Sequence, residues 1–280
     1  MTSSKIRLDQ FCARKGLSAS REKARREIIA GWVQVGGETV RDPSKRIPEN
    51  AVVTVKRPGG LFVSRGGEKL ERALEVFTID VDGVTVADLG ASTGGFTDCL
   101  LKRGAKKVYA VDVGYGQLDY SLQRDERVVV MDRTNARQLE REMFSDKVDF
   151  VTGDMSFVSI LKVIETMEKV FAPFHGVFLV KPQFEAGPGE HKKGVVRKKE
   201  VHEAILNRVL TGFIEAGMDL LNLTWSPVKG PAGNIEFLLH GSYMRDLSGD
   251  SILRENIEPL VHRIVEEAHE NLATHPVKEV

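Results

Sequence analysis

The stretch VADLGASTGGFTDCLLKRGAKKVYAVDVG, residues 86–114, decides the fold. It contains two apolar runs joined by a glycine-rich turn and a helix-like segment, and the second run ends on Asp112. Gly90, Gly94 and Gly95 allow the backbone to pass close to a ligand. An acid at the end of the second strand can accept hydrogen bonds from the two hydroxyls of a ribose. This order predicts a strand, turn, helix and strand that bind a nucleoside-containing cofactor.

The glycine turn also indicates which nucleoside is bound. It has the form D-x-G-x-x-x-G-G, which differs from the G-x-G-x-x-G of dinucleotide enzymes and has no Lys-Ser/Thr for a triphosphate. Its shape resembles that of S-adenosylmethionine methyltransferases. We expect Asp88 to order the turn, and Asp132 or Asn135 to lie beside the adenine edge. A tight strand–helix connection without a ligand is the alternative, but the acid one strand later favours binding.

Strand-like and helix-like segments alternate through most of the chain. The expected strands are 85–89, 107–112, 128–131, 148–154, 176–180, 220–225 and 235–240. Such alternation predicts an α/β fold with a mostly parallel, Rossmann-like sheet covered by helices on both faces. The last two strands follow one another without a clear helix between them, so we expect them to pair antiparallel.

The first 60 residues form a different pattern of two helices followed by short strands. They contain 13 Lys plus Arg against 6 Asp plus Glu, and the rest of the chain carries the compensating negative charge. In the second helix Ala24, Ile28 and Ile29 supply the buried side, and Gly36-Gly37 turn a hairpin. We expect a small α+β domain at 1–57, a linker at 58–61 and a catalytic domain at 62–280.

The N-terminal residues resemble the RNA-binding domain of ribosomal protein S4. The matching pieces are Arg7-Leu8-Asp9, Gly16-Leu17 with Ser20-Arg21, and the run GWVQV at 31–35. The resemblance implies contacts to the phosphates of structured RNA. The candidate RNA-binding residues in this domain are Arg7, Arg21, Lys23 and Arg25.

Other features of the sequence exclude several protein classes. The longest uncharged run, 170–180, is about half of the ~20 residues that a membrane helix needs. No positively charged leader precedes an apolar N-terminal segment. Cys12 and Cys99 are the only cysteines, too few for a disulfide framework or a zinc cluster. We therefore expect a cytoplasmic protein that requires no membrane and no metal.

Four charged residues stand where the sheet and its helices meet the predicted ligand site. They are Lys69, Asp154, Lys181 and Glu236. Lys181 directly follows the most apolar run of the chain, so its ammonium group must reach water or be stabilised by nearby acids. A single lysine at a strand end is as readily a solvated side chain, but four such residues together favour a site.

These four residues resemble the K-D-K-E tetrad of the FtsJ-type RNA 2′-O-methyltransferases. Together with the N-terminal domain, the chain is similar to the TlyA family of ribosomal RNA methyltransferases, some of which carry a haemolysin label. The motifs are VSRGGEKL, DLGASTGGFTD, DRTNAR, GDMSF, LVKPQFE and GNIEF. Ser92-Thr93 departs from the Ala-Pro that is usual in FtsJ relatives, which affects the shape of the turn.

The resemblance implies a reaction as well as a cofactor. It implies that S-adenosylmethionine is bound by Gly90, Gly94, Phe96, Asp112, Asn135 and Asp154, and we add Asp132 and Asp88 as further candidate cofactor-binding residues. It further implies 2′-O-methylation of a ribose, expected to be cytidine, in ribosomal RNA or ribosomal subunits, and it leaves the oligomeric state open. We expect Lys181 to be the general base, since burial beside the second cation Lys69 would favour its neutral amine. Asp154 and Glu236 would then orient the lysines and the hydroxyl.

Further residues are candidates for RNA contacts near the catalytic site. Arg65, Tyr115 and Arg133 are on loops expected at the same side of the sheet, and the loop 187–199 is glycine-rich and basic. Phe157, three residues after Asp154, is placed either to stack on the target base or to fill the core at the start of a helix.

Three other functions remain open from the sequence. A base N-methyltransferase would share the fold, but GDMSF lacks the N/D-P-P-Y/F pattern of that chemistry. A membrane-lysing protein would match the haemolysin label, but the sequence has no long apolar segment or strongly amphipathic basic helix. An RNA-binding protein that has lost catalysis is the third.

Overall fold

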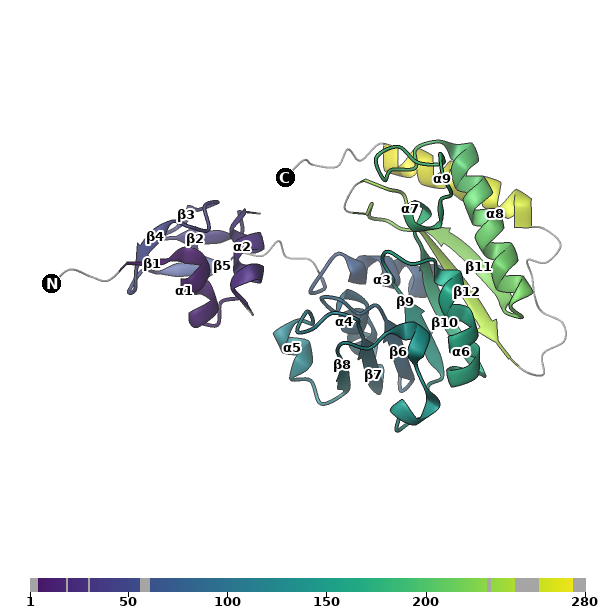
Figure 1. Ribbon diagram of the computed structural model, residues 1–280, viewed down its shortest axis with the longest axis horizontal. Helices are drawn as coiled ribbons and strands as arrows, with labels where there is room; N and C mark the ends of the chain where they lie inside the picture. The colour runs from purple at the N-terminus through teal and green to yellow at the C-terminus, as the bar shows by residue number, and fades with distance from the viewer. Residues whose placement is uncertain are drawn as a thin grey trace. The chain divides into compact units, whose positions relative to one another are not determined.

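A computed structural model describes residues 5–18, 20–29, 31–55, 61–230, 233–244 and 257–273. The chain divides into two compact units, with the boundary between Leu61 and Phe62 (Figure 1). Of the expected linker at 58–61, residues 58–60 lie outside the described residues.

The N-terminal unit contains two helices and two small antiparallel sheets. Its elements are β1 (Lys5–Arg7), α1 (Leu8–Arg14), α2 (Arg21–Ile29), β2 (Val33–Val35), β3 (Glu38–Thr39), β4 (Arg46–Pro48) and β5 (Val53–Val55). One sheet has the order β3-β2-β5 and the other pairs β1 with β4. The two helices pack their apolar sides over a core that includes Leu8, Phe11 and Val33.

Local signals in the sequence set this unit as expected, with one exception. Gly36 and Gly37 adopt φ values of +61° and +89°, the left-handed conformation that a tight hairpin needs. The Ser20 hydroxyl accepts the Lys23 N–H at 3.1 Å at the start of α2. Ile29, expected on the buried side of α2, is 52% exposed because it occupies the last position of the helix, beyond the core.

The C-terminal unit is built on a seven-stranded sheet of order β11-β12-β10-β9-β6-β7-β8. Its strands are β6 (Thr85–Leu89), β7 (Lys107–Val111), β8 (Val128–Met131), β9 (Phe150–Gly153), β10 (Phe174–Val180), β11 (Asp219–Trp225) and β12 (Phe237–Tyr243). β12 runs antiparallel to both of its neighbours, and the other neighbouring pairs are parallel. The predicted α/β fold with an antiparallel last strand is confirmed.

Helices cover both faces of this sheet. They are α3 (Gly66–Val76), α4 (Gly95–Lys102), α5 (Tyr120–Gln123), α6 (Ile164–Phe171), α7 (Pro182–Glu185), α8 (Lys199–Glu215) and α9 (Ile257–Ala273), with short 3-10 turns η1 (Ala136–Gln138), η2 (Arg141–Met143) and η3 (Ile160–Val163). Apolar residues of α3, α4 and α5 form one core with the sheet, and those of α6, α8 and α9 form the other.

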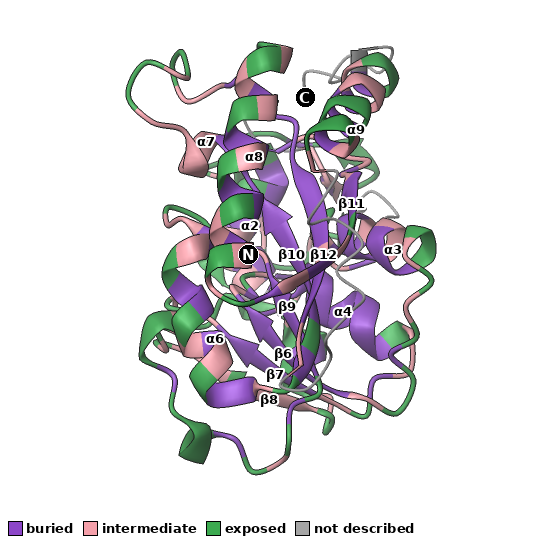
Figure 2. Ribbon diagram, turned by 90° about the vertical axis from the view of Figure 1, so that its right-hand side faces the viewer, coloured by how far each residue is buried: buried purple, intermediate pink, exposed green. Residues whose placement is uncertain are grey.

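Strand β10 contributes side chains to the hydrophobic cores on both faces of the sheet. Val177 and Leu179 pack on the α3–α4 side, whereas Phe178 and Val180 pack on the opposite side. All four are at most 2% exposed, and Figure 2 shows the central strands as buried. A strand buried on both faces requires a continuous apolar run, and this run ends at Lys181.

In the described parts of the chain, no helix is both long enough and apolar enough to cross a bilayer.

Candidate active site

The carboxyl ends of the central strands define the position of the site. The chain proceeds from β6 to β7 and β8 on one side, and from β9 to β10 on the other, so the strand order reverses between β6 and β9. Ligands of open α/β sheets bind at such a point. The residues that follow these strands are Gly90, Asp112, Asp154 and Lys181.

Two glycines of the turn are required by their positive φ values and by close neighbours. Gly90 has φ +83°, and a Cβ atom there would lie 2.7 Å from the carbonyl oxygen of Asp154. Gly94 has φ +95°, and a Cβ atom there would lie 2.3 Å from Leu122 Cδ1. Gly90 thus permits close approach of the β6 and β9 loops, and Gly94 permits packing against α5.

A cavity of about 210 Å³ opens above this turn. Its walls come from the start of α3, the turn, the end of β9 and the loop before β12: Ser64, Arg65, Gly66, Lys69, Gly90, Ala91, Ser92, Thr93, Gly95, Phe96, Asp154, Lys229 and Gly230. The expected cofactor residues Gly90, Phe96 and Asp154 are among them.

Asp88 lies beneath the turn rather than at the cavity, which corrects its expected place among the cofactor contacts. It is fully buried, and its two oxygens accept the hydroxyls of Thr97 at 2.7 Å and Thr152 at 2.9 Å. Burial raises the pKa of Asp88 to about 6. Asp88 therefore ties β6, β9 and α4 together and orders the turn from below.

The remaining expected cofactor residues lie on neighbouring loops. Asp112 accepts the N–H groups of Ser92 at 2.8 Å and Gly114 at 2.7 Å, so it stands directly beside the cavity wall. Asp132 accepts the Gly116 N–H at 2.9 Å. Asn135 is exposed and accepts the Arg137 N–H at 3.0 Å, which starts a 3-10 turn.

The four charged residues form two ion pairs. Lys69 Nζ lies 2.5 Å from Glu236 Oε2, and Lys181 Nζ lies 2.6 Å from Asp154 Oδ1. Both lysines are 8% exposed and Glu236 is 1% exposed. Each buried lysine is therefore paired with a different carboxylate, and this negative charge offsets the cost of removing the ammonium group from water.

Three residues of this site carried no signal that singled them out in the sequence. Ser156 Oγ accepts a hydrogen bond from Lys181 Nζ at 2.9 Å. Gln183 Nε2 donates to Glu236 Oε1 at 3.2 Å, and Lys229 lines the cavity. Ser156 and Gln183 each stand two residues from a charged residue of the site, and that spacing is the only available hint.

Phe157 is 90% exposed, so its alternative placement in the core is wrong. Its backbone has φ +65°, a conformation that is uncommon for a bulky side chain. Its ring centroid lies 5.1 Å from that of Phe184, whose ring in turn lies 5.8 Å from Lys181 Nζ. An exposed aromatic surface thus adjoins the buried lysine.

The other expected RNA-contact residues of this unit are also exposed. Arg65 lines the cavity. Arg133 stacks over the ring of Tyr115 at 4.5 Å, and Tyr115 is 71% exposed.

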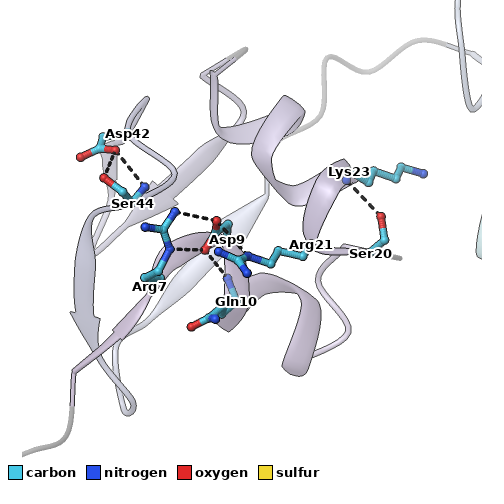
Figure 3. Close-up of polar contacts among 8 residues, drawn as sticks. All are labelled: Arg7, Asp9, Gln10, Ser20, Arg21, Lys23, Asp42 and Ser44. Carbon is cyan, nitrogen blue, oxygen red and sulfur yellow. Dashed lines mark hydrogen bonds and ion pairs between the residues drawn. The ribbon is translucent and has the colours of Figure 1, made fainter.

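In the N-terminal unit, the Asp9 carboxylate accepts hydrogen bonds from two of the expected RNA-binding arginines (Figure 3). Arg7 donates to both carboxylate oxygens, at 3.1 and 2.9 Å, and Arg21 Nε donates to Oδ2 at 3.2 Å. The Arg7 guanidinium holds the pKa of Asp9 below its usual range. Arg25 is exposed on α2, and Lys23 is partly exposed on the same helix.

The family comparisons agree with this geometry. The model of the FtsJ-like methyltransferases matches residues 62–243, the greater part of the chain. The chain belongs to the FtsJ-like methyltransferase family. The S4 domain model matches residues 6–53. Both resemblances drawn from the sequence are therefore confirmed.

Individual relatives of this FtsJ-like chain extend over nearly its whole length. Hemolysin A of Brachyspira hyodysenteriae is 44% identical over 84% of this chain and 99% of its own. The 16S/23S rRNA (cytidine-2′-O)-methyltransferase TlyA of Mycobacterium tuberculosis is 39% identical over 94% of this chain and 98% of its own. A solved structure labelled as a hemolysin from Streptococcus thermophilus has 36% identity, a TM-score of 0.74 and 98% coverage of both chains.

Proposed function

We propose that this protein methylates the 2′-hydroxyl of a ribose, on cytidine, in ribosomal RNA. The observation that carries the proposal is the Lys181 amine, buried at the end of β10 and paired with an acid that lines the cavity. The relative from Mycobacterium tuberculosis, whose name states this reaction, supports the choice of substrate.

The chemistry of the cavity fits S-adenosylmethionine. Asp112 beside the wall can accept the ribose hydroxyls, and the carboxylate of Asp154 suits the ammonium group of the methionine part. Peptide groups of the turn from Gly90 to Gly95 and the ring of Phe96 complete the surface. Bound S-adenosylmethionine would supply a methyl group on a positively charged sulfur, which becomes a neutral thioether when the methyl group leaves.

Lys181 is the residue that would move a proton. A ribose hydroxyl is a very weak acid, so its oxygen becomes a nucleophile only when a base removes the proton during attack. The lone pair of the neutral amine accepts this proton, and the resulting ammonium group faces Asp154 at 2.6 Å. The acid thereby stabilises the charge that forms on Nζ.

The second ion pair would position rather than react. Glu236 holds Lys69 at 2.5 Å, and Gln183 holds the other oxygen of Glu236 at 3.2 Å. This arrangement fixes Lys69 in the cavity wall, where its charge can orient the RNA or the cofactor.

RNA would be bound by two sets of exposed residues. The arginines around Asp9, with Lys23 and Arg25, would contact phosphates of folded ribosomal RNA. Arg65, Tyr115 and Arg133 would contact the target strand, and Phe157 would stack on the target base.

The test is incubation of the purified protein with ribosomal subunits and methyl-labelled S-adenosylmethionine. We expect label at a linkage that resists alkali, because 2′-O-methylation removes the hydroxyl that attacks the neighbouring phosphate. Label on alkali-sensitive nucleotides would instead support a base methyltransferase. The relatives from Brachyspira hyodysenteriae and Streptococcus thermophilus carry a hemolysin label, so dye-loaded liposomes without methyl donor form a parallel test; dye release would contradict the proposal.

A further inference from the structure

The amine of Lys181 has two neighbours that differ in geometry. Asp154 Oδ1 is buried and lies 2.6 Å from Nζ. Among the described residues it has no hydrogen-bond partner, because this short contact does not have the angles of a hydrogen bond. Ser156 Oγ, at 2.9 Å, does accept a hydrogen bond from Nζ. Asp154 therefore places a negative charge close to the nitrogen, whereas the hydrogen bond to Ser156 fixes the direction of one N–H bond.

Direction matters for an amine that must accept a proton. A neutral amine has two N–H bonds and one lone pair, and rotation about the Cε–Nζ bond exchanges their positions. An ion pair that lies off the hydrogen-bond axis does not restrain this rotation strongly. One N–H held by Ser156 sets the directions of the other two positions, and the lone pair then occupies a defined position for the substrate hydroxyl.

We propose that Ser156 is a positioning residue that orients the Lys181 amine for proton transfer. This inference rests on the proposed function of Lys181. The structure favours this role because Ser156 is exposed and its hydroxyl is turned to Lys181, whereas the nearby Ser159 hydroxyl accepts the Leu161 N–H at 3.3 Å and starts η3. The step itself is unchanged: the hydroxyl proton passes to Nζ, the oxygen bonds to the methyl carbon, and the carbon–sulfur electron pair stays on sulfur.

The test compares Ser156→Ala with Ser156→Thr, which keeps the hydroxyl, and with Ser159→Ala as a control in the same loop. Under single-turnover conditions with saturating ribosomal subunits and S-adenosylmethionine, we expect Ser156→Ala to lower the transfer rate about tenfold, the effect of losing one directional hydrogen bond. Half-saturating concentrations of both substrates should not change. Ser156→Thr should restore the rate and Ser159→Ala should retain it.

The split between the saturated rate and the half-saturating concentrations separates positioning from a structural role. Loss of the hydrogen bond from Nζ to Ser156 should lower the saturated transfer rate alone, whereas a structural loss would also raise the half-saturating concentrations. A wild-type rate in Ser156→Ala, half-saturating concentrations that rise as the rate falls, or a Ser156→Thr variant as slow as the alanine variant, would overturn the inference. A wild-type protein that forms no alkali-resistant linkage would instead refute the proposed function itself.

Discussion

Two clusters of cations and acids, one in each unit, have opposite patterns of burial. In the N-terminal unit the Asp9 side chain is 3% exposed, and the arginines it holds, Arg7 and Arg21, are 36% and 55% exposed. In the C-terminal unit the Lys181 side chain is 10% exposed and its partner Asp154 is 21% exposed. Asp9 is thus a buried acid that holds exposed cations, whereas Asp154 is the more exposed partner of a buried cation.

The residue types match these patterns. A guanidinium group stays charged and presents a planar fork that suits phosphate, so exposed arginines serve binding. A lysine amine can lose its proton when water is excluded, so a buried lysine serves proton transfer. Under the proposed function, the N-terminal cluster would determine affinity for RNA and the C-terminal cluster would determine the rate of methyl transfer.

The largest effect should come from removal of the buried amine. Lys181→Met keeps the length of the side chain and should lower methyl transfer by about 10³-fold, within the range for loss of a general base. Cofactor affinity should remain within about twofold in equilibrium titration, because Lys181 is not part of the cavity wall.

Lys147→Met is a matched control for this variant. Lys147 also pairs with an aspartate, Asp149, at 2.7 Å, but it is 64% exposed, so its loss should leave transfer unchanged. An active Lys181→Met enzyme would remove the functional distinction between the clusters.

An effect of intermediate size is expected on the free energy of unfolding, whose dependence on pH has opposite signs for Asp88 and Asp9. Burial raises the pKa of Asp88 to about 6. Between pH 6 and 3.8 the folded protein therefore binds a proton at Asp88 that the unfolded chain does not, and the free energy of unfolding grows as the pH falls through this range. The pKa of Asp9 is lowered by the Arg7 hydrogen bond, so its contribution is present above 3.8 and is lost at lower pH.

Urea unfolding of the full chain between about pH 2 and pH 7 checks these signs, because the Asp9 effect falls below pH 3.8 and the Asp88 effect above it. Asp88→Asn should remove a gain of at most ~3 kcal/mol on acidification, and Asp9→Asn should make the N-terminal unit less sensitive to acid. If both variants changed the pH dependence in the same direction, the contrast between a buried acid and an arginine-held acid would be wrong.

The smallest effect should come from the exposed arginines. The double variant Arg7→Ala/Arg21→Ala should weaken binding to ribosomal subunits about tenfold and reduce the slope of log affinity against log salt by ~1 to 2. Filter binding at several salt concentrations measures both. Arg26→Ala is the control, since it removes an exposed arginine of the same helix α2 that lies outside the Asp9 cluster and pairs with Glu22 at 2.8 Å. An unchanged slope in the double variant would exclude phosphate contacts by these residues.

The sequence predicts the fold well because its signals are local. The apolar run before Lys181 and the glycines at 90 and 94 constrain the backbone directly, and the strands appear within two or three residues of their expected bounds. The pairing of side chains is not local. Lys69 and Glu236 are 167 residues apart, and no spacing rule pairs them with each other rather than with Asp154 or Lys181.

The errors in the predicted site have the same origin. Asp88 stands at a strand end, where acids often face a ligand, but the hydroxyls of Thr97 and Thr152 bind it from two other elements. Ser156 and Gln183 are short polar residues of common type, and only the folded chain turns them toward Lys181 and Glu236.

A single-turnover experiment over a range of RNA and salt concentrations separates the two clusters in one measurement. The Arg7→Ala/Arg21→Ala protein should need more RNA for half-saturation, increasingly so at high salt, yet reach the wild-type rate at saturation. Lys181→Met should bind RNA as wild type does and show almost no transfer at any concentration. A Lys181→Met protein that reached the wild-type rate once saturated would contradict the assignment of the buried amine as the base.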